Sequence, residues 1–463
     1  MRRSVFDINR EHPEFAANRW MRKRYRDLYI GGEHLKLHAM EYLIRRQKEP
    51  ADVYAERLHR VFYENHIGSI VDWYAATLFR REPAIMFDGP NEAGKAFFSE
   101  FIDDCDLKGS NLNDFLSRQL VEAAISGSSF ILVDFPRASR PAENRAEEDA
   151  LGRSRAYLVD YSAEDVINWC YDERGNYEWV VLRTSSLRKD RVEDEHWERE
   201  TRWTYYDKSH FRMYRRVEAG TDKGRIELID EGTHGLAKQN QVPLFKLELS
   251  KGLWLLNKAG LLQLEHFNKS NALSWALTMG LFAMPVVYSD RPWNQMVGES
   301  YYIQLGPEDR FGWTEPEGKV FQIAADNLNR LQEEIYRVCY LSQAGGPLSG
   351  KEMQSGLSKQ RDFSITQDVL RAYGDAIKDL VKRVLRAIEA AREDGLAINV
   401  SGLDEFDIGD FGTELADAQA LLGLGIDSPT MKQQIFKKLA LKYLCDIRQD
   451  IKERITQEID SAV

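Results

Sequence analysis

Residues 266–290 read HFNKSNALSWALTMGLFAMPVVYSD, and the spacing of the apolar residues changes within this stretch. The first part has the three-to-four spacing of a helix, which Pro285 ends because proline lacks the amide donor that a helix interior needs. We therefore predict one long helix over 253–284 and a β-rich insert over 285–325. The order of a long helix followed by a small β insert is the feature on which the fold prediction rests.

The predicted helix is too polar to cross a membrane. Lys258, Glu265, His266 and Lys269 interrupt its apolar residues, whereas a span needs about 20 nearly uninterrupted ones. The N-terminus has the positive start of a signal peptide without an apolar core behind it, so export by that route is not expected. We expect no membrane partner.

The chain continues with further helical patterns on the C-terminal side. Residues 326–341 carry a single apolar stripe, and the segment 343–360 that follows is rich in glycine and is predicted to be a loop. A helix is then predicted over 362–394, about 50 Å long at ~1.5 Å per residue, and Gly395 is its natural stop. Three short helices end the chain, beginning near Thr413, Ser428 and Asp446.

The N-terminal half predicts helices first and strands later. Residues 18–84 have helical spacing that Gly31-Gly32 interrupts, and two strand-like runs follow over 128–136 and 155–169. Four alternating segments within 174–250 predict an antiparallel meander. The predicted fold class is α+β, mainly α.

The charge balance bears on which partners the protein can have. The chain has 463 residues with 63 basic and 74 acidic side chains, a formal net charge of -11. This excess of acidic side chains argues against a protein whose whole surface binds nucleic acid, although it permits local contact with DNA. Basic residues gather in RWMRKRYRD over 19–27, which we interpret as a solvated helix face rather than a nucleic-acid patch, because acidic residues are interleaved with the basic ones around it.

Cysteine and histidine spacing predicts neither a metal nor a cofactor. The cysteines Cys105, Cys170, Cys339 and Cys445 are far apart, and no histidine lies near them at metal-ligand spacing. We interpret all of them as ordinary buried or half-buried thiols in a reducing compartment.

One segment resembles a nucleotide-binding loop. Residues 89–96, GPNEAGKA, have the glycine and lysine spacing of a P-loop, and Asp134 ends an apolar strand as a magnesium ligand would. However, Ala96 replaces the serine or threonine that binds magnesium, and Pro90 removes a backbone donor. A turn before a helix is the simpler interpretation, so no catalytic residue is assigned and the protein is predicted not to be an enzyme.

Four segments, in this order and spacing, resemble the portal proteins of tailed bacteriophages, in particular the branch common in long-tailed phages. They are AAISGSSFILVDFP at 123–136, the segment 156–185, the opening stretch 266–290, and IQLGPEDRFGWTEPEGKVFQI at 303–323. The resemblance covers about residues 50–400. It implies a ring-forming subunit with a wing, a stem, a clip and a small helical crown.

The resemblance also implies how the chain divides into these parts. The division is 1–252 for the wing, with 156–250 as its β-rich portion, 253–284 and 326–342 for the two stem helices, 285–325 for the clip, 343–360 for the tunnel loop, 361–412 for the long wing helix and a return strand, and 413–463 for the crown.

A portal protein forms a ring, usually of twelve subunits, at one capsid vertex of the virion, after assembly in the cytoplasm of the host bacterium. The resemblance thus implies a channel through which double-stranded DNA is packaged and ejected. The implied partners are other copies of the chain, the large terminase, the major capsid protein and the head-tail adaptor. Two other functions stay open: a P-loop ATPase of DNA packaging, and a head-assembly protein that forms no ring.

Within the expected tunnel loop and beside it, Lys351, Lys359 and Arg361 are the candidates for cations that face DNA at the narrowest point. The alternative is that they keep the loop soluble or pair between subunits.

Overall fold

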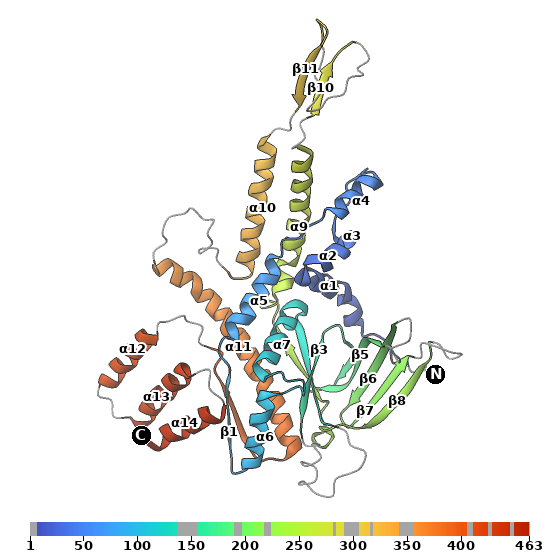
Figure 1. Cartoon of the computed structure of the whole chain (residues 1–463). Coiled ribbons are helices and arrows are strands. Elements are labelled where there is room, and N and C mark those ends of the chain that lie inside the picture. Colours follow the sequence, from blue (N-terminus) through green and yellow to red (C-terminus); the bar gives the residue numbers. More distant parts are fainter. Residues whose placement is uncertain are drawn as a thin grey trace. The chain divides into compact units, whose positions relative to one another are not determined.

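The structure is a computed structural model that describes residues 7–136, 155–188, 197–216, 224–280, 284–290, 305–314, 318–341, 356–404, 411–424, 428–444 and 449–462. The chain divides into two units. The first comprises Met1–Tyr25, Val71–Asn257 and Ser355–Val463, and the second Arg26–Ile70 and Lys258–Gln354. Helices and strands are mixed, with about half of the chain helical, in agreement with the predicted α+β class (Figure 1).

A five-stranded antiparallel sheet in the first unit has the order β4-β5-β6-β7-β8. Its strands are β4 (Val166–Tyr171), β5 (Tyr177–Arg188), β6 (Glu198–Asp207), β7 (His210–Arg216) and β8 (Ile226–Thr233). Strands β5 to β8 pair in chain order, so the predicted meander over 174–250 is confirmed. Strand β4 extends it by one strand.

A second sheet of the same unit has the order β3-β2-β9, from β2 (Ser128–Asp134), β3 (Tyr157–Ser162) and β9 (Leu244–Glu248). The 3-10 helix η1 (Ala237–Gln239) precedes β9. The prediction of one strand-like run over 155–169 was wrong, because β3 and β4 belong to different sheets. The carboxylate of Asp165 accepts hydrogen bonds from the amide and the hydroxyl of Ser162, at 2.8 and 2.6 Å, and so fixes the turn that separates them.

Two hydrophobic clusters hold the sheets of the first unit. Helix α1 (Pro13–Ile30) contributes Phe15 to a cluster with Ile8, Ile167, Val181 and Trp203 on the five-stranded sheet. The other cluster joins residues of both sheets, namely Phe130, Leu132, Ala163, Val166, Val180, Leu182, Tyr206, Phe211, Val242 and Leu244.

The long helix α11 (Gly356–Arg392) contacts β9, β12 and α7 within the first unit. Its buried stripe follows the predicted spacing, with Tyr373, Ile377, Leu380, Val384 and Ile388 all buried. The helix begins at Gly356, so the prediction of a loop over 343–360 was wrong for its last five residues. The helical spacing of this segment extends further toward the N-terminus than its glycines indicated.

A two-stranded ladder in the first unit pairs a strand from the N-terminal half with the strand that follows α11. Strand β1 (Ala84–Asp88) pairs antiparallel with β12 (Ala397–Ser401), which is the predicted return strand. Helices α6 (Glu92–Asp103) and α7 (Leu112–Ser126) follow β1 in the chain. The three predicted terminal helices are confirmed as α12 (Phe411–Gly423), α13 (Pro429–Tyr443) and α14 (Gln449–Ala462), and the Ser428 hydroxyl caps α13.

The second unit is built on the long helix α9 (Leu255–Gly280), most of which belongs to it. Short helices surround its core: α2 (Gly32–Leu37), α3 (Ala39–Tyr42), α4 (Ala51–His59) and the first turn of α5 (His66–Leu78). The core consists of Leu28, Leu35, Ala39, Tyr42, Leu43, Val61 and Phe267. No helix in the described part of the chain is both long and apolar enough to span a bilayer.

Three amide side chains of α9 fix the extended segments that link these short helices. Each amide donates to a backbone carbonyl and accepts from a backbone N–H, as a neighbouring strand would. This double hydrogen bond satisfies backbone groups that no helix or sheet pairs. The bonds join Gln263 to Glu64 O and Ile67 N, Asn268 to Tyr42 O and Ile44 N, and Asn271 to both backbone groups of Phe62, at 2.8 to 3.2 Å.

Candidate functional site

A pair of antiparallel helices is the part of the second unit on which the functional prediction depends. Helix α10 (Gly318–Val338) lies beside α9 (Figure 1). The Lys269 ammonium donates to Asn327 Oδ1 at 3.0 Å, and Lys258 donates to the hydroxyl of Tyr340. Because the earlier residue of α9 meets the later residue after α10, the two helices run in opposite directions.

A two-stranded antiparallel ladder connects them. Strand β10 (Met284–Tyr288) pairs with β11 (Arg310–Thr314), with Val286 opposite Gly312. The insert predicted over 285–325 is therefore β-structured in its described strands, but its last residues are not. Helix α10 begins at Gly318, because its apolar residues continue the helical stripe upstream of the predicted start at 326.

The predicted DNA-facing cations are only partly placed. Lys351 lies outside the described residues. Lys359 and Arg361 lie on the first two turns of α11, so their backbone is helical, and their side chains are outside the described part. Their role toward DNA stays a prediction.

The segment that resembles a P-loop has ordinary helix-capping contacts. Asn91 Oδ1 accepts from Gly94 N at 3.0 Å and caps α6, and the Asn91 amide donates to the backbone carbonyl of Asp394 at 3.1 Å. The Lys95 ammonium pairs with Glu92 at 3.0 Å. The predicted turn before a helix is therefore observed.

The basic stretch 19–27 is less exposed than predicted. The Arg22 guanidinium donates to the carbonyl of Ala163 at 3.1 Å, and burial lowers its pKa. Arg19 pairs with Glu11 at 3.2 Å. The interpretation of this stretch as a solvated helix face was therefore wrong at Arg22, whereas the Arg19 side chain stays about half exposed.

Two of the cysteines are confirmed as buried thiols. Burial raises the pKa of Cys105 and that of Cys339 to about 12, so neither is a thiolate at neutral pH. Cys170 is half-buried, and Cys445 lies outside the described residues.

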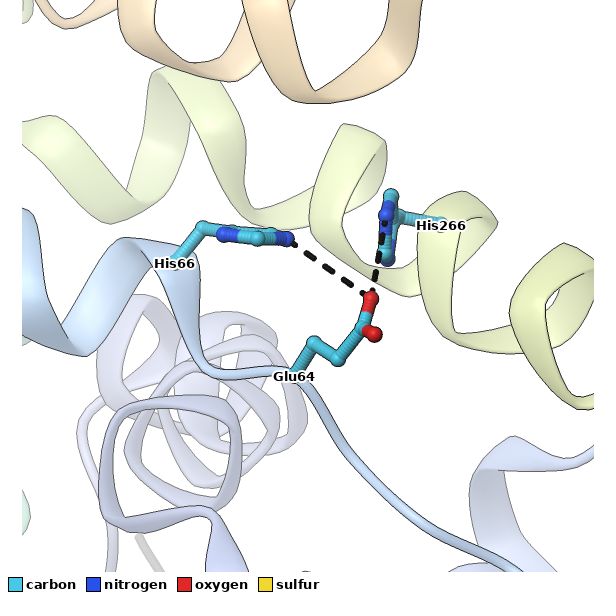
Figure 2. A group of neighbouring side chains, drawn as sticks. All are labelled: Glu64, His66 and His266. Carbon is cyan, nitrogen blue, oxygen red and sulfur yellow. Dashed lines mark ion pairs between the residues drawn. The ribbon is translucent and has the colours of Figure 1, made fainter. Parts of the chain in front are cut away.

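A cluster of two histidines and a carboxylate lies where the start of α5 meets α9 (Figure 2). Glu64 Oε2 is 3.4 Å from His266 Nε2 and 3.9 Å from His66 Nε2. The two imidazole rings are 4.8 Å apart, edge to face, and the ring of Tyr336 on α10 lies 6.3 Å from that of His66. Three segments that are far apart in the sequence thus meet at one point.

Both imidazoles of this cluster are neutral at pH 7. Burial, with a smaller effect of the neighbouring His266, lowers the pKa of His66 to about 4. Burial also lowers the pKa of His266, against the opposing effect of Glu64. Gln263, one turn before His266 on α9, binds the backbone carbonyl of Glu64 and the backbone amide of Ile67. These two hydrogen bonds position the segment that carries Glu64 and His66.

This cluster could not be predicted from the sequence. Glu64 and His66 are two residues apart, but His266 lies some 200 residues further along the chain. The amide contacts of α9 help to bring them together, and amide side chains carry no sequence signal for the backbone that they bind.

A groove of about 1400 Å³ lies within the first unit, between the turn over 171–177, β9 and α11. Two of its cations are engaged within the chain: Lys208 pairs with Asp172 at 3.0 Å, and Arg383 donates to the carbonyl of Lys246 at 2.8 Å. The groove is lined by both acidic and basic side chains, so it does not present a surface of one charge.

No protein-family model matches the chain, and no curated protein matches it. Among solved structures, a chain in the neck of an empty gene transfer agent particle, computed with six-fold symmetry, is 12% identical, with 84% of this chain and 95% of that chain covered and a TM-score of 0.46. A chain in the virion of a native gene transfer agent particle is 11% identical, with 86% and 98% covered and a TM-score of 0.41. Both TM-scores are too low to establish a shared fold.

Proposed function

We propose that this chain is the subunit of a portal ring at one vertex of a phage-like capsid, through which double-stranded DNA enters and leaves. The observation that carries the proposal is the antiparallel pair α9 and α10, joined through β10 and β11 and followed by the 37-residue helix α11. In the portal family that the sequence resembles, this order corresponds to stem, clip, stem and long wing helix. The protein would then be a structural conduit without a catalytic site.

Apolar side chains on the stem helices support self-assembly. Val320 and Ile323, one turn apart on α10, are 62% and 60% exposed, and Leu277 on α9 is 42% exposed. A single subunit leaves these side chains in water. Neighbouring subunits around a ring would cover them, and removing this apolar surface from water would stabilise the assembly.

The charge of the chain fits a channel that DNA must slide through. Each phosphate that a fixed cation neutralises adds non-specific affinity through counterion release. The subunit has 63 basic and 74 acidic side chains, so its acidic groups outnumber its cations and its net charge is -11. In this proposal Lys351, Lys359 and Arg361 supply the limited positive charge near the narrowest point, and the large terminase, major capsid protein and head-tail adaptor bind the ring from outside.

Sedimentation of the purified full chain tests the self-assembly. We expect a large closed oligomer for the wild type and for Asn329→Glu, an exposed position on α10 that receives one negative charge. The double variant Val320→Glu and Ile323→Glu should lower the oligomer fraction at least about tenfold, because charge on that face must be desolvated on assembly. An unchanged oligomer in the double variant would remove this face from the interface.

A packaging assay tests the cations separately. Charge reversal by Lys351→Glu with Lys359→Glu should impair DNA packaging or retention while the ring persists. Unchanged packaging and retention would remove these residues from the DNA path and leave the ring proposal standing.

A further inference from the structure

We propose that Glu64, His66 and His266 form a binding site for a divalent transition metal ion of the zinc class, which ties the start of α5 to α9. The proposal concerns the second unit alone and does not depend on the portal function.

The geometry of the three side chains is close to that of a zinc site. Their ligand atoms lie within 4.8 Å of one another, with 3.4 and 3.9 Å from the Glu64 oxygen to the two imidazole nitrogens. Ligands bound tetrahedrally at about 2.0–2.1 Å from zinc are about 3.3 Å apart. Small side-chain rotations therefore suffice to bring all three donors onto one ion.

One buried nitrogen of the cluster needs a partner. The Nε2 of His66, which lies 3.9 Å from the Glu64 oxygen, is buried and has no hydrogen-bond partner among the described residues. A buried polar atom without a partner destabilises the folded state. A metal ion accepts a lone pair from such an imidazole nitrogen.

The ligand set selects the class of ion. Two imidazoles and one carboxylate suit zinc and its neighbours in the first transition series rather than calcium or magnesium, which prefer oxygen ligands. Glu64 keeps 51% of its side chain exposed, so a water molecule can reach the ion as a fourth ligand.

A second cluster of the same unit provides the comparison. Asp27, His38 and Glu41 also lie within metal-binding distance. However, Asp27 already accepts hydrogen bonds from His34 at 2.8 Å and from Tyr42 at 2.5 Å, and His38 pairs with Glu41 at 3.0 Å. Each of its groups thus already has a hydrogen-bond partner, so this cluster lacks the unpartnered buried nitrogen that points to an ion.

The test uses the full chain without a histidine tag, stripped of metal with a chelator. Co²⁺ is titrated while visible absorption is followed, and Zn²⁺ binding is measured by calorimetry and by the thermal unfolding midpoint. We expect one ion per chain, the intense absorption of four-coordinate Co²⁺ without thiolate charge-transfer bands, and a higher unfolding midpoint with Zn²⁺.

Variants assign the binding to the cluster. Glu64→Gln changes a half-exposed side chain, and together with His66→Gln it should weaken Zn²⁺ binding at least about tenfold and abolish the midpoint shift. His38→Gln, in the second cluster, should bind as the wild type does. The proposal would be overturned if the wild type did not bind, or if the double variant Glu64→Gln with His66→Gln bound Zn²⁺ as tightly as the wild type. Thiolate bands in the Co²⁺ spectrum, or loss of binding in His38→Gln, would overturn it as well.

Discussion

The ammonium group of Lys258 on α9 lies 3.9 Å from the centroid of the Tyr340 ring and also donates a hydrogen bond to the hydroxyl of that residue. Tyr340 follows α10 with φ +61°, a left-handed conformation common just after a helix end. One side chain of α9 thus engages the residue that ends its antiparallel partner.

We expect Lys258→Met to lower the stability of the helix pair by about 1 kcal/mol, the sum of a modest cation–π contact and one hydrogen bond. Tyr340→Phe, which keeps the ring, should cost less. Calorimetric unfolding midpoints check this order, with Lys251→Met, an exposed lysine of the first unit, as the control. Equal losses in Lys258→Met and in the control would contradict the role of this contact.

Asn271→Leu should lower the stability of the second unit, although it replaces a polar side chain with an apolar one of similar size. The variant leaves both backbone groups of Phe62 without their partners, at a cost of about 2 kcal/mol. Ser274→Ala, one turn away on the exposed face of α9, should leave the midpoint unchanged. Hydrogen exchange of the Phe62 amide provides a local measurement, and protection that persists in Asn271→Leu would show that the amide does not hold this segment.

Gly374→Ala is expected to destabilise the first unit, although alanine normally favours a helix by about 1 kcal/mol over glycine. A Cβ at position 374 would lie 2.0 Å from the backbone carbonyl oxygen of Leu403, so α11 and that segment must separate. A Cβ at Gly423 in α12 would meet no atom of the described residues within 4 Å, so Gly423→Ala serves as the matched control. Thermal unfolding that is no lower for Gly374→Ala than for the control would refute the close approach.

Acid should weaken the second unit partly through Glu49. Burial raises its pKa, but hydrogen bonds from the Arg57 guanidinium and the Arg46 amide outweigh burial and leave the pKa below the ordinary 4.5. Because the folded pKa is the lower one, this stabilisation is complete above about pH 4.5 and is lost as the pH falls through the folded value.

Unfolding midpoints measured at several pH values from about 6 down to about 3 check this linkage. Glu49→Gln should have a shallower decline than the wild type, whereas Glu56→Gln, from an ion pair with Arg60 that is half exposed, should decline like the wild type. Parallel curves for the wild type and Glu49→Gln would contradict the assignment.

Helices whose apolar residues keep a regular spacing were predictable from the sequence. The stripe of Tyr373, Ile377 and Leu380 defined α11, and that of Ile67, Ile70 and Tyr74 defined α5, because one buried face repeats every three or four residues. Boundaries were less predictable. The first residues of α10 were predicted as part of the β-rich insert, although the helix begins at Gly318.

The histidine cluster and the amide contacts were not predictable. Gln263 and Asn271 look like ordinary polar residues of a helix, and their function depends on which backbone segment lies opposite. The candidate cations Lys351, Lys359 and Arg361 were proposed from the sequence and its resemblance, and they stay predictions.

The most direct test of the portal account is electron microscopy of the purified full chain, with class averages viewed down the axis of any assembly. The account predicts closed rings of one subunit type around a central channel wide enough for double-stranded DNA, with the α9–α10 pairs lining or surrounding that channel. Monodisperse single subunits under all conditions, or closed assemblies without a central channel, would contradict it.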